Sequence, residues 1–301
     1  MSGQRIGFVG LGAMGQGQAR NLLQAGFDVV GCDSDPARAA SFVEAGGKVA
    51  ASPAEAARDA DLFVVLVFDA GQAESVLFAD NSGAVAALPA GVPVVLHTTG
   101  APEDARRLAG RLAEAGHPML DAPVTGGKAG ADAGTLTVIV SGPEAAIATA
   151  TPAFEAMGRR IVRVGSEPGQ ASTVKMINQL LVGVHTAACA EALTLAVKAG
   201  ADPEAVVEVI TNGAGNSRAF EGRAPQILAR DFDVRGALSI LVKDLGIVTE
   251  AGRRHAVPLP LASAALQQYL AATARGLGPE DLASVVKVYE AMAGTEVVPK
   301  R

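Results

Sequence analysis

Apolar and polar positions divide the first half of the chain into short apolar runs and stretches with helical periodicity. The apolar runs, short enough for strands buried on both faces, cover residues 5–9, 28–32, 62–67, 92–97, 118–120, 136–141 and 160–164. Helical patterns follow a glycine-rich turn at 10–15 and also cover residues 36–45, 53–58, 72–78, 102–115 and 143–157. This alternation predicts an α/β fold with a doubly wound, mainly parallel sheet.

The second half of the chain carries only helical patterns. They cover residues 170–200, 203–211, 237–254, 260–274 and 279–293. The pattern changes at residues 165–169, where Gly-Ser-Glu-Pro-Gly interrupts the chain. We therefore expect two domains, an α/β domain at 1–166 and an all-helical domain at 167–301.

A glycine motif joins the first apolar run to the first helical pattern. Gly10 permits a tight turn, Gly12 lets the backbone approach a pyrophosphate, and Gly15 lets the helix pack closely on the strand. A pyrophosphate would lie at the unpaired amides of that helix. The alternative is a glycine-rich turn without a ligand. The motif predicts a Rossmann domain whose cofactor-binding residues include Gly10, Leu11, Gly12, Ala13, Met14 and Gly15.

The second apolar run ends in an acid. Asp33 lies 18 residues after Gly15, where a carboxylate is expected to bind the adenosine ribose diol. Its charge would repel a 2′-phosphate. No Arg follows it directly, since Arg38 is five residues on and beyond Pro36. The sequence therefore favours NAD over NADP as the cofactor.

Charge and composition exclude several other classes of function. The 301 residues have a net charge of −6 and a pI near 5.3, with no basic run, so a nucleic-acid partner is not expected. The most apolar stretch, 180–199, contains His185, Glu191 and Lys198, which favours a buried helix over a membrane span. A secretory signal is not expected, because the first strand starts at residue 5. We expect a cytoplasmic protein.

The number and spacing of the cysteines give no support for a metal site. Cys32 and Cys189 are far apart and belong to no Cys-x-x-Cys motif, which indicates a reducing compartment. Apolar surface on the helices of the second half, above all at 180–199, exceeds what one small domain buries. A homo-oligomer, a dimer or a tetramer, is therefore expected.

Two further segments contain residues that could bind substrate or cofactor, and a third, around Lys175, could transfer a proton. Residues 121–127 read Asp-Ala-Pro-Val-Thr-Gly-Gly, and a hydroxyl followed by two glycines exposes backbone amides suited to a carboxylate. A plain Pro/Gly loop is the alternative. Residues 243–246 read Lys-Asp-Leu-Gly within an apolar helical pattern, where the alternative is a surface ion pair of little energetic value.

Lys175 lies on an otherwise apolar face of the predicted helix at 170–200. Asn178 and Gln179 follow at the third and fourth positions, so they lie beside it. Partial desolvation of the ammonium would lower its pKa towards values useful for proton transfer. The alternative is a solvated lysine at a domain edge.

Together these segments resemble the 3-hydroxyisobutyrate dehydrogenase, or β-hydroxyacid dehydrogenase, family over essentially the whole chain. The resemblance rests on four motifs in the family's order and spacing. They are the start Gly-Phe-Val-Gly-Leu-Gly-Ala-Met-Gly, then Asp-Ala-Pro-Val-Thr-Gly-Gly, Gly-x-x-x-x-x-Lys-x-x-Asn and Lys-Asp-Leu-Gly. It implies a Rossmann domain, a helical domain built on the long helix, and NAD-dependent oxidation of a small 3-hydroxy acid.

The resemblance also implies roles for single residues. Lys175 matches the catalytic lysine, and Lys243 matches a lysine that reaches the nicotinamide end of the cofactor. Thr99 matches a cofactor contact, and Asp69 falls in a loop along the cofactor path. The implied substrate-binding residues are Thr125, Gly126, Gly127, Asn178 and Gln179.

Within the family, residues 175–183, 213–217 and 242–246 look most like the L-threonate dehydrogenases, which suggests L-threonate or a related sugar acid as substrate. Those members carry His where this chain has Asn178 and an aromatic residue where it has Arg218, and many family members carry Asn at the position of Gln179. Alternatives are a 3-hydroxyisobutyrate dehydrogenase, a tartronate semialdehyde (2-hydroxy-3-oxopropionate) reductase, and a non-catalytic NAD-binding sensor.

Overall fold

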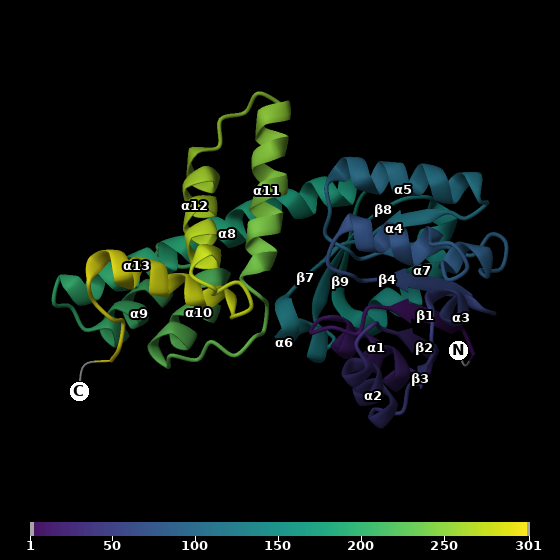
Figure 1. Cartoon of the computed structure of the whole chain (residues 1–301), viewed down its shortest axis with the longest axis horizontal. Helices are drawn as coiled ribbons and strands as arrows, with labels where there is room; N and C mark the ends of the chain where they lie inside the picture. Colours follow the sequence, from purple (N-terminus) through teal and green to yellow (C-terminus); the bar gives the residue numbers. More distant parts are fainter. Residues whose placement is uncertain (1–2, 300–301) are drawn as a thin grey trace. The chain divides into compact units, whose positions relative to one another are not determined.

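The computed structural model describes residues 3–299. Contacts within the chain divide it into two compact units, Met1–Met176 and Ile177–Arg301. Figure 1 shows the helices and strands, most of them labelled. The boundary falls inside a long helix, so the first turns of that helix belong to the first unit.

The first unit is built on a nine-stranded, mainly parallel sheet, as the sequence predicted. Eight strands follow the order β3-β2-β1-β4-β5-β6-β8-β7, and β9 pairs with β8. All pairs are parallel except those of β8 with β6 and β7. The strands are β1 (Arg5–Val9), β2 (Asp28–Cys32), β3 (Lys48–Val49), β4 (Leu62–Val65), β5 (Val94–Leu96), β6 (Met119–Asp121), β7 (Val124–Thr125), β8 (Leu136–Ser141) and β9 (Gly158–Gly165).

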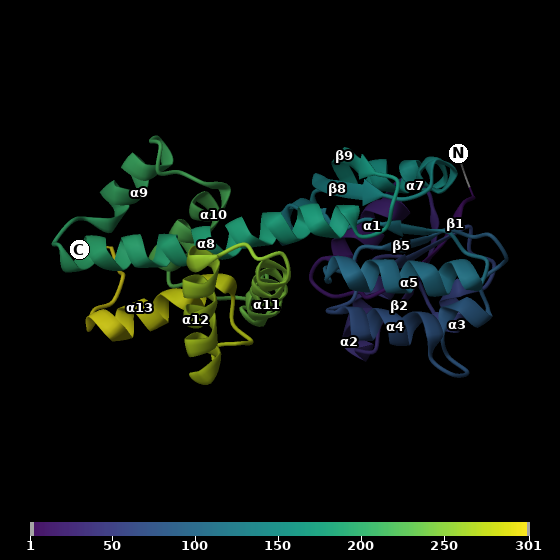
Figure 2. The same cartoon turned by 90° about the horizontal axis from the view of Figure 1, so that it is seen from above.

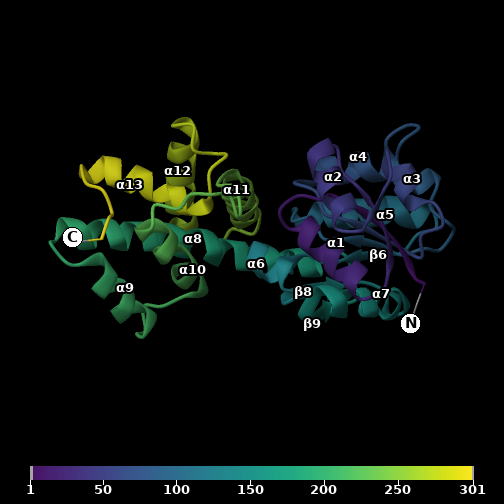
Figure 3. The ribbon, with the colours of Figure 1, turned by 90° about the horizontal axis from the view of Figure 1, so that it is seen from below.

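Helices cover both faces of this sheet because its central strands are apolar on both sides. The helices are α1 (Gly15–Gln24), α2 (Pro36–Glu44), α3 (Pro53–Ala57), α4 (Ala70–Phe78), α5 (Pro102–Glu114), α6 (Gly127–Asp132) and α7 (Glu144–Met157), with a 3₁₀ turn η1 (Ala84–Ala86). One core packs α1 and α7 against the sheet, and the other packs α3, α4 and α5. Figure 2 shows α4 and α5 on one side of the strands and α7 on the other. Figure 3 shows α1 beside α7, which contact each other.

The elements that the sequence analysis missed in this unit are the short ones. Strands β3 and β7 have two residues each, and α6 has six. Such segments are too short to show a periodicity. The two strands form because β2 and β8 offer them hydrogen-bond partners.

Helix α8 (Gln170–Lys198) begins in the first unit and continues into the second. Among residues 3–299 it is the one helix long and apolar enough to cross a membrane, judged by length and composition, and 44% of its apolar window is buried. Core helices of soluble proteins have the same length and composition. This helix therefore gives no independent evidence for a membrane span.

Within residues 177–299 every element of the second unit is a helix, as predicted. Besides α8 it has α9 (Pro203–Thr211), α10 (Arg218–Leu228), α11 (Ser239–Arg254), α12 (Pro260–Ala274), the 3₁₀ turn η2 (Leu282–Val285) and α13 (Val286–Ala293). Helices α11 and α12 lie side by side (Figure 1). Tyr269 is fully buried, and its hydroxyl donates to the Gly183 carbonyl over 2.8 Å, which ties α12 to α8.

Two helical segments of this unit differ from the sequence prediction. Helix α10 was missed, because Pro225 inside it argues against a helix. The pattern predicted at 279–293 begins instead as η2 and continues as α13. The reason is the fully buried Asp281, whose carboxylate accepts the amide of Ala283 over 3.1 Å and the amide of Arg235 over 2.9 Å. These bonds start the chain in a 3₁₀ turn.

Candidate functional site

The glycine turn after β1 leaves no room for a side chain at Gly10 or Gly15 but has free space next to Gly12. Gly10 has φ of +102°, and a Cβ there would lie 1.9 Å from the Leu66 carbonyl oxygen. A Cβ at Gly15 would lie 1.8 Å from the Gly10 carbonyl oxygen. At Gly12 the nearest atom to such a Cβ is Nη1 of Arg38, 3.7 Å away. Only glycine fits at Gly10 and Gly15, whereas the space over Gly12 suits the close approach of a pyrophosphate, so the turn fits NAD.

Asp33 follows β2 and holds this turn in place. Its side chain is 7% exposed. One carboxylate oxygen accepts the amide of Leu11 over 2.7 Å, and the other accepts the amide of Asp35 over 2.8 Å. The acid therefore ties the glycine turn to the start of α2 while it faces the same edge of the sheet.

Arg38 does not follow Asp33 directly in the chain, but the fold brings it beside Asp33, which the sequence did not predict. Nη1 of Arg38 lies 3.7 Å from Oδ1 of Asp33. Asp35 caps α2 by accepting the amide of Ala37, and Pro36 begins the helix. The first turn of α2 brings Arg38 back over the glycine turn.

Loops after β4 and β5 carry the other cofactor candidates in this unit. Asp69 caps α4, because its Oδ1 accepts the amide of Gln72 over 2.8 Å. Thr99 is half-buried just after β5. Its neighbour Thr98, which the sequence analysis did not single out, accepts the amide of Val67 over 3.0 Å and so links the ends of β4 and β5.

The segment at 121–127 is not a plain loop. Val124 and Thr125 form β7, and Gly126 and Gly127 have φ of +137° and +66°, values that favour glycine. A Cβ at Gly126 would also lie 2.9 Å from Cδ2 of Leu136. The two glycines are thus required for the turn from β7 into α6.

Asp121, the first residue of this segment, caps helix α8. It is fully buried, and its Oδ2 accepts the amides of Gly169 over 2.8 Å and Ser172 over 2.9 Å. Its Oδ1 accepts the hydroxyl of Ser172 over 2.7 Å. Burial raises the pKa of Asp121, and these hydrogen bonds oppose that rise. An acid at the end of an apolar strand was the only sequence signal for this role.

A buried histidine supports the same segment. His97 is 1% exposed, and its Nδ1–H donates to the Ala122 carbonyl. Its ring packs at a tilt against Phe154, with 5.8 Å between centroids. Burial lowers the pKa of His97 to about 4, so the ring is neutral near pH 7. His97 therefore holds the backbone next to Asp121 without carrying a charge.

Lys175 lies one turn after Ser172 on α8 and is 7% exposed. The alternative interpretation, a solvated lysine, is therefore wrong. Asn178 and Gln179 follow within the next turn of the same helix. The Asn178 amide donates to Oε1 of Gln179 over 3.0 Å.

In the second unit Gln179 belongs to a series of linked polar side chains. Its Nε2 donates to Oδ2 of Asp244 over 2.5 Å, and Nζ of Lys243 lies 2.9 Å from Oδ1 of Asp244. The side chains of Lys243 and Asp244 are 17% and 1% exposed, so they do not form the surface ion pair considered above. Asp244, which the sequence analysis did not include among the site residues, is the acid that links Lys243 to Gln179.

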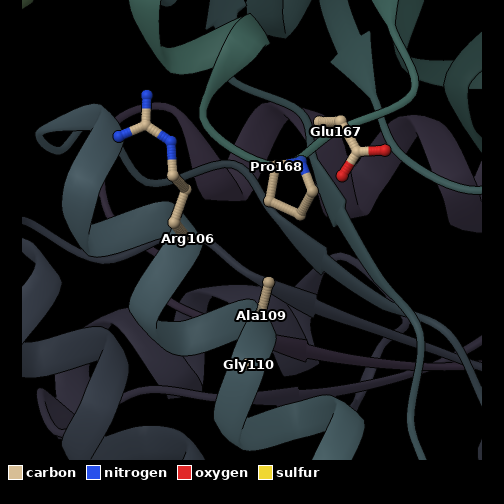
Figure 4. A pocket seen from close by; sticks show the side chains of 5 residues that line it. All are labelled: Arg106, Ala109, Gly110, Glu167 and Pro168. Atoms are coloured by element: carbon tan, nitrogen blue, oxygen red, sulfur yellow. The ribbon is translucent and has the colours of Figure 1, made fainter.

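A pocket of about 520 Å³ lies between α5 and the segment before α8 (Figure 4). It is lined by Arg106, Ala109, Gly110, Glu167 and Pro168, none of which is a predicted site residue. No group of three or more His, Cys, Asp or Glu side chains suited to a metal occurs in residues 3–299.

Two family models match consecutive parts of the chain. Residues 5–165 match the NAD binding domain of 6-phosphogluconate dehydrogenase. Residues 169–289 match the model described as NAD-binding of NADP-dependent 3-hydroxyisobutyrate dehydrogenase. The chain belongs to the 3-hydroxyisobutyrate dehydrogenase family. It is thus an NAD-binding oxidoreductase of the β-hydroxyacid dehydrogenase class, which confirms the family, fold and cofactor predictions.

Relatives of this family match over nearly the whole length. The chain is 46% identical over 286 residues to an L-threonate dehydrogenase of Cupriavidus necator, covering 95% of this chain and 96% of that protein. It is 34% identical to the NAD-dependent L-serine dehydrogenase of Pseudomonas aeruginosa, covering 97% and 99%. A solved structure of 3-hydroxyisobutyrate dehydrogenase from Salmonella typhimurium has a TM-score of 0.89 and 41% identity, covering 94% of this chain and 99% of that one.

Proposed function

We propose that this chain oxidises L-threonate, or a closely related sugar acid, with NAD, and that Lys175 is the acid-base group. The observation that carries the proposal is the buried position of Lys175, one turn beyond the helix start that Asp121 caps. The substrate follows from relatives of 39–46% identity that are named L-threonate dehydrogenases.

The substrate carboxylate binds at Thr125, Gly126 and Gly127, where the glycine turn presents backbone amides. Neutral Lys175 then takes the proton of the substrate hydroxyl on Nζ. NAD, when bound, would supply the acceptor for the hydride of the carbinol carbon. In the reverse direction protonated Lys175 returns the proton to the carbonyl oxygen.

Amide side chains orient the reacting groups in this proposal. Asn178 and Gln179 have no useful pKa, so they act by hydrogen bonding to substrate or to Lys175. Gln179 is held by Asp244, which fixes the direction of its amide. Lys243 is paired with the same acid, and by its match to the family motif it would hold the nicotinamide end of the cofactor.

The other cofactor contacts are proposed at the carboxyl edge of the sheet. The glycine turn would bind the pyrophosphate, Asp33 would bind the adenosine ribose, and Asp69 and Thr99 would line the cofactor path on the other side of the glycine turn, after β4 and β5. Support comes from the open space above Gly12 and from the position of Asp33 beside the turn.

We also propose a cytoplasmic homo-oligomer. Leu181, Ala188 and Leu195 are exposed at seven-residue spacing on α8, so they form one apolar stripe of that helix. The exposed fractions of the two leucines are 48% and 67%. A second copy of the chain would bury such a stripe.

A substrate panel tests the function. The full-length protein is given NAD and L-threonate, D-threonate, 3-hydroxyisobutyrate, glycerate or L-serine, and NADH formation is followed by absorbance. The highest kcat/KM is expected for L-threonate. A higher value for 3-hydroxyisobutyrate or glycerate would move the assignment to those substrates, and NAD binding without any turnover would favour the non-catalytic sensor.

A further inference from the structure

Arg38 lies at the open side of the glycine turn, beside the acid proposed to bind the ribose. Its Nη1 is 3.7 Å from Oδ1 of Asp33, and its Nε is 3.3 Å from Oδ2 of Asp35. A Cβ on Gly12 would lie 3.7 Å from the same Nη1. The Arg38 backbone is fixed as well, because Nε2 of Gln16 donates to its carbonyl over 2.6 Å.

The two partners of this ion pair differ in how firmly they are held. The Asp33 side chain is 7% exposed and accepts two backbone amides, whereas the Arg38 side chain is 53% exposed. Exposed ion pairs hold their cation weakly. The guanidinium of Arg38 can therefore turn to another anion at this position while Asp33 stays in place.

In Rossmann domains the acid after the second strand binds the ribose 2′-hydroxyl, and a nearby Arg accommodates a 2′-phosphate. A 2′-oxygen within hydrogen-bond distance of Asp33 would also lie within reach of Arg38. Arginine suits this contact because its planar guanidinium binds two phosphate oxygens at once.

We propose that Arg38 is a specificity-determining residue of the cofactor site that contacts a 2′-phosphate and offsets the charge of Asp33. The preference for NAD then rests on the Asp33 carboxylate alone. The chain still binds NADP measurably, and removal of the Asp33 charge makes NADP the preferred cofactor. The inference concerns the dinucleotide site and does not depend on which hydroxy acid is oxidised.

Binding of NADH and NADPH to the full-length protein tests this directly, by isothermal titration calorimetry without substrate. The quantity compared is the ratio of the two dissociation constants, because loosening of the turn in an Asp33 variant weakens both ligands alike. Unchanged protein should bind NADH about tenfold more tightly than NADPH. Asp33→Asn should shift the ratio towards NADPH by at least about thirtyfold.

Arg38→Gln measures how much the guanidinium of Arg38 alone contributes to the ratio of the two dissociation constants. In the Asp33→Asn background it should remove at least about tenfold of the shift towards NADPH, while NADH affinity stays within about twofold. Arg163→Gln is the matched control, since it removes the same charge from an arginine that pairs with exposed Glu144. That control should leave the ratio unchanged.

Two results would overturn the proposal. One is an Asp33→Asn protein whose ratio stays at the unchanged value. The other is a double variant, Asp33→Asn with Arg38→Gln, that keeps the full preference for NADPH. A failed substrate assignment would alter neither measurement, because no turnover is involved.

Discussion

The carboxylate of Asp121 accepts the hydroxyl of Ser172 over 2.7 Å, although the two residues are 51 positions apart in the chain. This contact joins the end of β6 to the first turn of α8. Lys175 follows Ser172 by less than one helical turn. By holding Ser172, Asp121 therefore fixes the position of the helix segment that carries Lys175. The same acid begins the segment proposed to bind the substrate carboxylate. One buried side chain thus connects the two proposed parts of the reaction.

Replacing Asp121 should impair both stability and turnover. Asp121→Ala leaves two buried amides and one hydroxyl without their acceptor, which costs about 2–4 kcal/mol of unfolding free energy. Asp121→Asn keeps one acceptor oxygen, so its loss should be smaller. Urea unfolding and kcat are measured for both variants.

A second helix cap gives the control for Asp121. Asp202 caps α9 by accepting the amide of Glu204 over 3.2 Å. Asp202→Ala should cost about 1 kcal/mol and leave kcat unchanged. If Asp121→Ala lowered stability but left kcat as high as Asp202→Ala does, the positioning role would be wrong.

Lys175→Ala should lower kcat by about 10²- to 10⁴-fold and leave NADH binding within about twofold. Lys175→Arg should also be inactive, because a guanidinium keeps the charge but does not release a proton near neutral pH. Steady-state kinetics and calorimetry measure the two effects. Lys198→Ala, at the exposed end of α8, is the control. Near-normal turnover in Lys175→Ala would exclude the proposed mechanism.

Acid should destabilise the protein through His97. Burial lowers its pKa to about 4 in the folded state, while the unfolded value is about 6.5. Between these values only the unfolded chain binds the proton, so stability is complete above pH 6.5 and is lost as the pH falls towards 4. The loss from this group is about 3 kcal/mol over that range.

Urea unfolding at pH 7 and pH 5 measures the His97 effect. His97→Asn can still donate to the Ala122 carbonyl but does not titrate, so its stability should fall less between the two pH values than that of unchanged protein. Exposed His255 provides the control variant His255→Asn, which should behave like unchanged protein. Equal pH dependence in all three proteins would refute the prediction.

The exposed stripe on α8 predicts self-association. Sedimentation at micromolar concentration should give a mass above that of the 30.3 kDa chain. Leu181→Glu combined with Leu195→Glu should shift the protein towards the monomer, because charges would be buried in the interface. Val43→Glu, at an exposed position of α2, should not. A monomer in the unchanged protein would rule out the oligomer.

Local patterns in the sequence determined most of the fold. Strands and helices of sufficient length, such as β2, α9 and α12, match the periodicity because their own apolar residues decide which face is buried. The glycine turn was also predictable, since steric demands at Gly10 and Gly15 are set by neighbouring residues. Family motifs, by their order along the chain, predicted Lys175 and the segment at 121–127 as candidate site residues.

Contacts between distant residues were decided only by the tertiary structure. The pairing of Gln179 with Asp244, 65 positions away, and the capping of α8 by Asp121 depend on how whole elements pack. Arg38 reaches Asp33 because the first turn of α2 folds back over the loop. A sequence pattern reports the burial of each element one by one, whereas hydrogen bonds between elements depend on their relative placement within a unit. Polar partners far apart in the chain leave no periodic signal, and the folded structure was needed to find them.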